Sequence, residues 1–273
     1  MKFGVCSMIK NENLYLREWV EHYIELGFDK IILYDNNEIN GEVPNVVIQD
    51  YIDNGVVDII NRRQSALPAR EWVYFQINAF NECIEQYKNE LDWIAFLDID
   101  EFLELKQYKK IQYLFEHMPY NKFDAIIMSW YSVGNKNELY YKNKNVQERF
   151  SDHLTGPYDM AENIDTFVKS FVNTSVCPKF KDHIHCPKSE NVCNEYGVLC
   201  TGTDAIMMLN YPNHEIMYIK HYYTKSLIEF LYRSINNCTL TRNIYNYKKI
   251  NGWSEEHEKV YQKFLKDNNI IAS

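Results

Sequence analysis

The sequence predicts an α/β protein in which helices flank a mostly parallel sheet. Two observations lead to this prediction. The first half of the chain alternates short apolar segments with longer segments whose apolar residues recur at helical spacing, in the order strand, helix, strand, helix, strand. Polar side chains follow the strand-like segments at three places, and the carboxyl ends of parallel strands are where such sheets bind ligands.

Local patterns define the elements of the first half. Leu14–Leu26 places apolar residues on one helical face, and Gly27 follows as a helix stop. Arg70–Tyr87 has the length and spacing of a second helix. The predicted strands are Phe3–Met8, Lys30–Tyr34, Val46–Tyr51, Val56–Ile60 and Trp93–Leu97.

The second half is less regular. Phe123–Tyr131 predicts a strand, and Lys225–Arg242 predicts a helix with one apolar face. Phe167–Ser175 and Ala205–Leu209 are too short to assign. No repeat or low-complexity linker marks a boundary, so we expect a single domain over residues 1–273 with an irregular C-terminal half.

Composition narrows the class of protein. The formal net charge of -9 argues against a nucleic-acid backbone as the main partner, which would need a basic face. Seven cysteines, an odd number, follow a start with no apolar leader, and no apolar run is long enough to span a membrane. We therefore expect a reducing cytoplasmic location.

The most informative motif is Asp98-Ile99-Asp100-Glu101, which follows the apolar run Trp93–Leu97 directly. A turn at the end of a buried strand lets both aspartates converge on one cation. Two like charges buried together need a counter-charge, and carboxylate oxygens suit Mg²⁺ or Mn²⁺. The alternative is that Asp98 starts a turn and Asp100 is solvated.

Three runs together carry a resemblance: IKNENLYLREWVEHYIELGFDKIILYDN, WIAFLDIDEFLEL and YIKHYYTKS. They resemble glycosyltransferases of the Rossmann-like GT-A fold, and more narrowly glycosyltransferase family 92 with its bacterial family 2-like relatives. The resemblance implies transfer of a sugar from a nucleotide-sugar, most simply a uridine diphosphate (UDP) sugar, to a glycan hydroxyl. It also implies inversion at the anomeric carbon and a Mn²⁺ or Mg²⁺ cofactor.

The resemblance also implies roles for individual residues. Asp98 and Asp100 would hold the metal, with His221 as a further ligand and His183 or His185 as its rivals. Lys10, Asn11 and Glu12 would contact the nucleotide, although Asn11 is equally suited to cap the helix that follows. The remaining donor-binding candidates are Asp35, Asn36, Arg70, Gln76, Asp98 and Lys225.

An inverting transfer needs a base beside the acceptor hydroxyl. The region from Arg149 to Asp165 offers four acidic candidates, from which we select Asp152 and Glu162; the other two are Asp159 and Asp165. Residues 1–105 would bind the donor and residues 106–273 the acceptor.

The acceptor is expected to be a glycan or a lipid-linked saccharide, and the aromatic and basic segment Tyr245–Lys249 suggests peripheral contact with the inner face of a membrane. The competing interpretations are a metal-dependent nucleotidyltransferase or phosphohydrolase, and an inactive carbohydrate-binding relative. The sequence predicts no oligomeric state.

Overall fold

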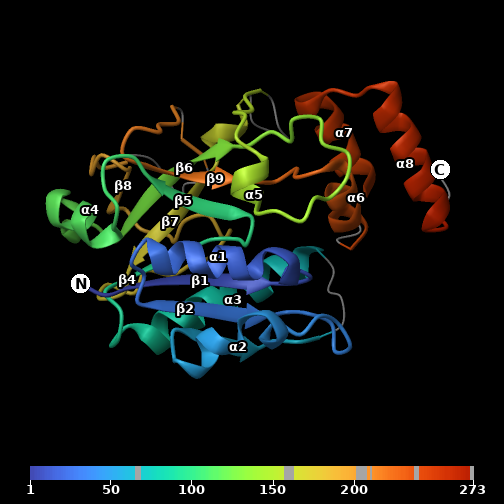
Figure 1. Cartoon of the computed structure of the whole chain (residues 1–273). Coiled ribbons are helices and arrows are strands. Elements are labelled where there is room, and N and C mark those ends of the chain that lie inside the picture. The colour runs from blue at the N-terminus through green and yellow to red at the C-terminus, as the bar shows by residue number, and fades with distance from the viewer. Residues whose placement is uncertain (65–68, 157–162, 201–207, 210, 237–239, 271–273) are drawn as a thin grey trace. The chain divides into compact units, whose positions relative to one another are not determined.

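The computed structural model describes residues 1–64, 69–156, 163–200, 208–209, 211–236 and 240–270 (Figure 1). The chain divides into two compact units. Unit 1 comprises Met1–Trp130 and Thr166–Ile219, and unit 2 comprises Tyr131–Asp165 and Lys220–Ser273. Because each unit draws on two separate stretches of chain, the boundary does not follow the predicted division near residue 105. The prediction of a single domain remains a prediction.

The first half alternates strands and helices as predicted. Its elements are β1 (Phe3–Ile9), α1 (Asn13–Glu25), β2 (Lys30–Asp35), α2 (Asn45–Asp53), β3 (Val57–Asn61), α3 (Ala69–Tyr87), β4 (Trp93–Phe96) and β5 (Glu101–Leu105). Gly27 ends α1 as expected: its φ is +93°, and the N–H groups of Gly27 and Phe28 donate to the carbonyls of Ile24 and Tyr23. This is the hydrogen-bond pattern of a Schellman motif.

One predicted strand is wrong. Val46–Tyr51 lies within helix α2, where Ile48 is buried and Val46 is 77% exposed. The run Val46-Val47-Ile48 is apolar enough for a strand, but short apolar runs do not distinguish the two states. In a strand, Val46 and Ile48 would point to the same face. Because Val46 is exposed and Ile48 is buried, the segment fits a helix with one covered face.

The described strands form one nine-stranded sheet with the order β3-β2-β1-β4-β7-β6-β9-β5, in which β8 pairs with β6. The pairs β1–β2, β2–β3 and β1–β4 are parallel, whereas β7 (Val168–Asn173) runs antiparallel to β4 and β6. The predicted α/β class with a mixed, largely parallel sheet flanked by helices is therefore confirmed.

Helices cover both faces of this sheet in unit 1 (Figure 1). Helix α3 packs on one face, where Phe80 contacts Phe96 of β4. Helix α4 (Ile111–His117) covers the other, where Phe115 contacts Phe3 and Trp93. A strand buried on both faces must be apolar on both, which explains the continuous apolar run of β4.

The second half is less regular in its order of elements. They are η1 (Tyr120–Lys122), β6 (Ala125–Ser132), α5 (Val146–Arg149), η2 (Ile164–Thr166), β8 (Val192–Cys193), β9 (Met217–His221), α6 (Leu227–Asn236), α7 (Leu240–Asn251) and α8 (Glu255–Asp267). The predicted strand Phe123–Tyr131 is confirmed as β6. The predicted helix Lys225–Arg242 covers α6 and the start of α7, with residues 237–239 between them outside the described residues.

Unit 2 has its own apolar core. Phe230 of α6, Tyr247 of α7 and Phe264 of α8 are buried in one cluster. Ser254 caps α8, because its hydroxyl accepts from the N–H of His257. Among the described residues, no helix has both the length and the apolar character needed to cross a membrane.

Candidate functional site

The polar segments that follow β1 and β2 meet at one edge of the sheet in unit 1. The N–H of Asn11 donates to Asn37 Oδ1 at 2.8 Å, and Lys10 Nζ lies 3.5 Å from Glu38 Oε1. Two of the three polar clusters singled out in the sequence are therefore in direct contact. That Lys10, Asn11 and Glu12 bind a nucleotide stays a prediction.

Asn11 does not cap helix α1, so that alternative was wrong. Its φ of +57° lies in the left-handed region, and the N-cap position is Glu12, which makes no side-chain cap bond. The first helical N–H, that of Asn13, donates instead to Glu42 Oε2 at 2.8 Å. A carboxylate distant in the sequence takes the place of the local cap.

Asp35 is buried at the end of β2 and is bound within the protein through both oxygens. Oδ2 accepts from Arg63 Nε at 2.7 Å, and Oδ1 accepts from the backbone and side-chain nitrogens of Asn37. Gln64 Nε2 donates to Asn36 Oδ1 at 3.2 Å. Asp35 therefore fixes the shape of this edge, and its contact with a nucleotide, like that of Asn36, stays a prediction.

The two aspartates lie in a tight turn after β4, as predicted. The N–H of Glu101 donates to the Asp98 carbonyl at 3.0 Å, and the N–H of Asp98 donates to Glu101 Oε2 at 2.8 Å. Asp100 and Glu101 are buried, whereas the Asp98 side chain is 34% exposed. The turn thus concentrates three carboxylates, and Asp98 is the one that solvent or a ligand reaches most easily.

The counter-charge for this turn is Lys169, a residue of β7 that the sequence analysis missed. Its Nζ lies 2.7 Å from Asp98 Oδ2 and 3.2 Å from Glu101 Oε2, and its side chain is 1% exposed. Burial alone would lower the pKa of Lys169, but the carboxylates of Asp98 and Glu101 outweigh burial and raise it, so the ammonium stays charged. Lys169 is 71 positions from Asp98, and no local pattern links them.

His185 lies next to the strand that carries Lys169, because its ring contacts the carbonyl of the neighbouring residue Val168. Burial, reinforced by Lys169, lowers the pKa of His185 to about 4, so the imidazole is neutral at pH 7. Its Nδ1 is 2.9 Å from the Val168 carbonyl, which can only accept, so Nδ1 carries the proton. The lone pair is therefore on Nε2, the arrangement that metal-ligating histidines adopt.

Helix α3 holds the backbone of the segment that precedes His185. Asn81 Nδ2 donates to the Phe180 carbonyl and Asn81 Oδ1 accepts from the Phe180 N–H, both at 2.9 Å, which anchors the segment leading to His185. Gln76 is buried, and Arg70 lies in the first turn of α3. Donor contacts by Gln76 and Arg70 stay predictions.

Four further predicted site residues belong to unit 2. His221 and Lys225 are both buried there, and the His221 ring lies 5.7 Å from that of Tyr223. Asp152 is on the surface, with a 61% exposed side chain whose Oδ1 is 3.7 Å from Lys136 Nζ. Glu162 lies outside the described residues. The roles predicted for all four stay predictions.

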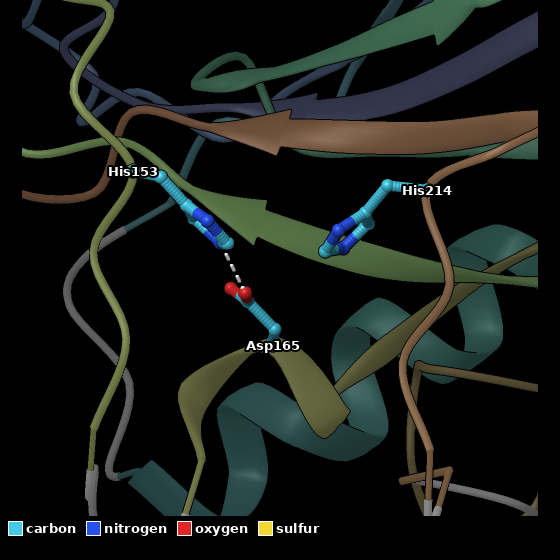
Figure 2. Close-up of side chains that lie close together, drawn as sticks. All are labelled: His153, Asp165 and His214. Atoms are coloured by element: carbon cyan, nitrogen blue, oxygen red, sulfur yellow. Dashed lines mark hydrogen bonds and ion pairs between the residues drawn. The ribbon is translucent and has the colours of Figure 1, made fainter.

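A pair that the sequence analysis did not single out also lies in unit 2. His153 Nε2 is 2.5 Å from Asp165 Oδ2, and Figure 2 shows the ring and the carboxylate aimed at each other. His214, drawn in the same view, belongs to unit 1, where its Nε2 lies 2.8 Å from the Trp130 carbonyl oxygen. Asp165 was one of four acidic candidates for a base, but no sequence spacing pointed to His153 as its partner.

Relatives with known family membership match part of the chain. A glycosyltransferase family 92 protein of Arabidopsis thaliana is 33% identical over 98 residues, which are 36% of this chain and 16% of the relative. One from Ricinus communis is 28% identical over 102 residues, covering 37% of this chain and 17% of the relative. The chain thus spans about one sixth of the length of these relatives.

Among solved structures, S. aureus TarS 1-349 matches with a TM-score of 0.43 and 10% identity, covering 98% of this chain and 80% of that one. The complex of TarS 1-349 with UDP-GlcNAc matches with a TM-score of 0.36 and 14% identity over 49% of this chain and 35% of that one. Similarity at this level does not bear on function.

The sequence model of glycosyltransferase family 92 matches residues 2–196, which contain all of β1 to β8 and the whole aspartate turn. This match extends over more than half of the chain, and it includes the two N-terminal runs that first suggested the resemblance. The chain belongs to glycosyltransferase family 92.

Proposed function

We propose that this protein transfers a sugar from a UDP-sugar to a hydroxyl of a glycan or lipid-linked saccharide, with inversion and with a divalent cation at the aspartate turn. Family membership supports glycosyl transfer as the reaction class. The observation that carries the proposal is the turn Asp98–Glu101 at the carboxyl edge of a parallel sheet, where α/β proteins bind nucleotides.

The donor chemistry of the residues at and beside the turn suits a divalent cation. Asp98 offers a partly exposed carboxylate whose Oδ2 is held by Lys169, and Asp100 adds a second, buried carboxylate two positions on. His185 is neutral, with its lone pair on Nε2. Carboxylate oxygens with one imidazole form a donor set suited to Mn²⁺, and carboxylates alone suit Mg²⁺.

When bound, such a cation would offset the negative charge that gathers on the diphosphate as the glycosidic bond breaks. The protein's own part is to hold the two carboxylates in place. Lys169 and the Glu101 N–H fix the turn from inside the sheet. The nucleoside of the sugar donor would then bind at the sheet edge after β1 and β2, which is formed by Asn11, Asn37 and Arg63. We also propose that the protein is cytoplasmic and contacts the membrane peripherally.

A thermal-shift experiment tests this function. The full chain is heated with UDP, other nucleoside diphosphates and UDP-sugars, each with Mn²⁺ or with EDTA. We expect stabilisation by UDP compounds only when Mn²⁺ is present, and its loss in Asp100→Asn. Asp53→Asn, an exposed aspartate at the end of α2, is the matched control. Stabilisation by UDP that is unchanged in EDTA, or unchanged in Asp100→Asn, would refute the metal role.

A further inference from the structure

The loop of residues 135–145, which precedes α5 in unit 2, is rich in polar side chains and is anchored by its backbone. Four of its eleven residues are asparagines, three are lysines and two are tyrosines. The N–H groups of Leu227 and Ile228, at the start of α6, donate to the carbonyls of Glu138 and Leu139 at 2.9 and 3.1 Å. The loop is therefore fixed where it meets α6.

A buried ion-pair network centred on Arg149 lies under this loop. The Arg149 side chain is 1% exposed, and its Nη2 lies 2.5 Å from Glu229 Oε2 and 3.3 Å from Glu138 Oε1. Its Nη1 donates to Glu229 Oε1 at 3.0 Å. Two parallel hydrogen bonds to one carboxylate fix the plane of a guanidinium group as well as its position. Arg149 is therefore held in one orientation.

The guanidinium group of Arg149 in turn fixes the ring of Tyr141. Arg149 Cζ lies over this ring, 5.3 Å from its centroid, and the Tyr141 hydroxyl donates to Asn143 Oδ1 at 3.2 Å. Tyr141 is nevertheless 38% exposed. Because the buried Arg149 covers one face of the ring, the exposed surface is the part that is turned away from Arg149. A ligand in solvent can therefore reach an aromatic ring whose plane is already set.

We propose that Tyr141 is a stacking platform for a saccharide ring, and that the loop of residues 135–145 binds the glycan that accepts the transferred sugar; this inference rests on the proposed function. One face of a sugar ring consists of C–H bonds, which pack flat against an aromatic ring. The hydroxyls at its edge pair with amide groups, and the exposed Asn143 provides one beside Tyr141. A ring that is ordered before the ligand arrives lowers the entropic cost of binding.

The charges of the loop favour an uncharged glycan over an anionic membrane as its ligand. Basic patches that bind anionic lipids contain about four to eight lysines or arginines. The loop has three lysines, and two of them face a carboxylate: Lys136 Nζ lies 3.7 Å from Asp152 Oδ1, and Lys142 Nζ lies 3.5 Å from Glu138 Oε1. Their positive charge is therefore largely offset within the protein.

Saturation-transfer difference NMR of the full chain tests this inference with three uncharged probes: maltoheptaose, cellopentaose and N-acetylchitotetraose. We expect at least one probe to bind, with the strongest transfer to the C–H protons of its sugar rings. Aromatic stacking changes affinity by about 2- to 12-fold, so Tyr141→Ala should weaken binding by that amount, whereas Tyr141→Phe keeps the ring and should retain most of the affinity. Tyr245→Ala is the matched control. Tyr245 is 61% exposed in the same unit, but the cation near its ring is the exposed Lys249, which does not fix it.

Binding of UDP with Mn²⁺ is measured on the same samples, because saccharide binding at this loop is expected with or without UDP. Equal saccharide affinities in Tyr141→Ala and Tyr245→Ala, or no transfer to any of the three probes, would overturn the inference while intact UDP binding leaves the proposed function standing. Binding to phosphatidylglycerol vesicles that Tyr141→Ala abolishes, without saccharide binding, would also overturn it. Failure of the unsubstituted protein to bind UDP would overturn the proposed function instead.

Discussion

Replacing Lys169 by methionine tests the electrostatics of the aspartate turn. The substitution keeps the length of the side chain and removes its charge. The ammonium lies 2.7 Å from Asp98 Oδ2 and 3.2 Å from Glu101 Oε2, and at an effective dielectric constant near 20 these pairs attract by about 6 and 5 kcal/mol. Desolvation of the three groups offsets most of that attraction.

The net loss of stability in Lys169→Met depends on the buried carboxylate that remains without its partner. Glu101 is fully buried and would lose the ammonium that offsets its burial, and breaking a buried ion pair by removing one partner costs about 3–5 kcal/mol. For a unit of this size, 1 kcal/mol corresponds to about 2–4 °C, so the melting temperature should fall by roughly 6–20 °C. Because a divalent cation would replace the missing positive charge, Mn²⁺ should stabilise Lys169→Met more than the unsubstituted protein.

Differential scanning fluorimetry in EDTA and in Mn²⁺ measures both effects. Lys179→Met is the matched control, since Lys179 pairs with Glu85 in the same unit but both side chains are more than 40% exposed. Exposed pairs contribute about 0–1 kcal/mol, so this control should melt close to the unsubstituted protein. Lys169→Arg should recover part of the loss. Equal melting temperatures for Lys169→Met and Lys179→Met would refute the assignment of Lys169 as the counter-charge.

Two further predictions concern other buried groups. His185→Ala should weaken Mn²⁺ binding, measured by titration calorimetry, by about 10- to 100-fold or more, whereas His117→Ala should not; equal affinities would exclude His185 as a ligand. Burial raises the pKa of Glu195 to about 7, so the neutral carboxyl stabilises the fold fully below about pH 4.5 and this stability is lost as pH rises through 7. Glu195→Gln should therefore gain up to about 3 kcal/mol over the unsubstituted protein between pH 5 and pH 8, and a difference that does not change with pH would contradict this.

The alternation of strands and helices in the first half was predictable because each element carries its own signal. Gly27 ends α1 and the apolar run before Asp98 is a buried strand, and both are properties of short stretches of chain. The failure at Val46–Tyr51 has the same origin, since a local pattern does not reveal which face of an element will be covered. Helix α4 escaped prediction because its pattern spans only two turns.

His185 was named as a rival metal ligand, but the position of a site residue was predictable only where the residues lie next to each other in the chain. Asp98 and Asp100 follow a strand directly, so their position at the sheet edge could be inferred. Lys169 and His185 reach the turn through β7 and the segment after it, and that placement depends on the antiparallel pairing of β7 with β4. That strand pairing cannot be predicted from the composition of the chain or from the spacing of its residues.

Lys169 removes one reason to expect a metal. Two buried carboxylates were expected to take a divalent cation as their counter-charge, but Lys169 provides a buried ammonium for Asp98 and Glu101. Burial of like charges is therefore not by itself a reason to expect a metal here. The proposal now depends on different observations: Asp98 is partly exposed although Lys169 holds one of its oxygens, and the tautomer of His185 leaves Nε2 able to bind. Because Lys169 already offsets the charges of Asp98 and Glu101 from inside, the turn does not need a cation in order to form, so the cation would bind to a prepared site. Preparation of this kind lowers the cost of binding, because the carboxylates are ordered before the donor arrives.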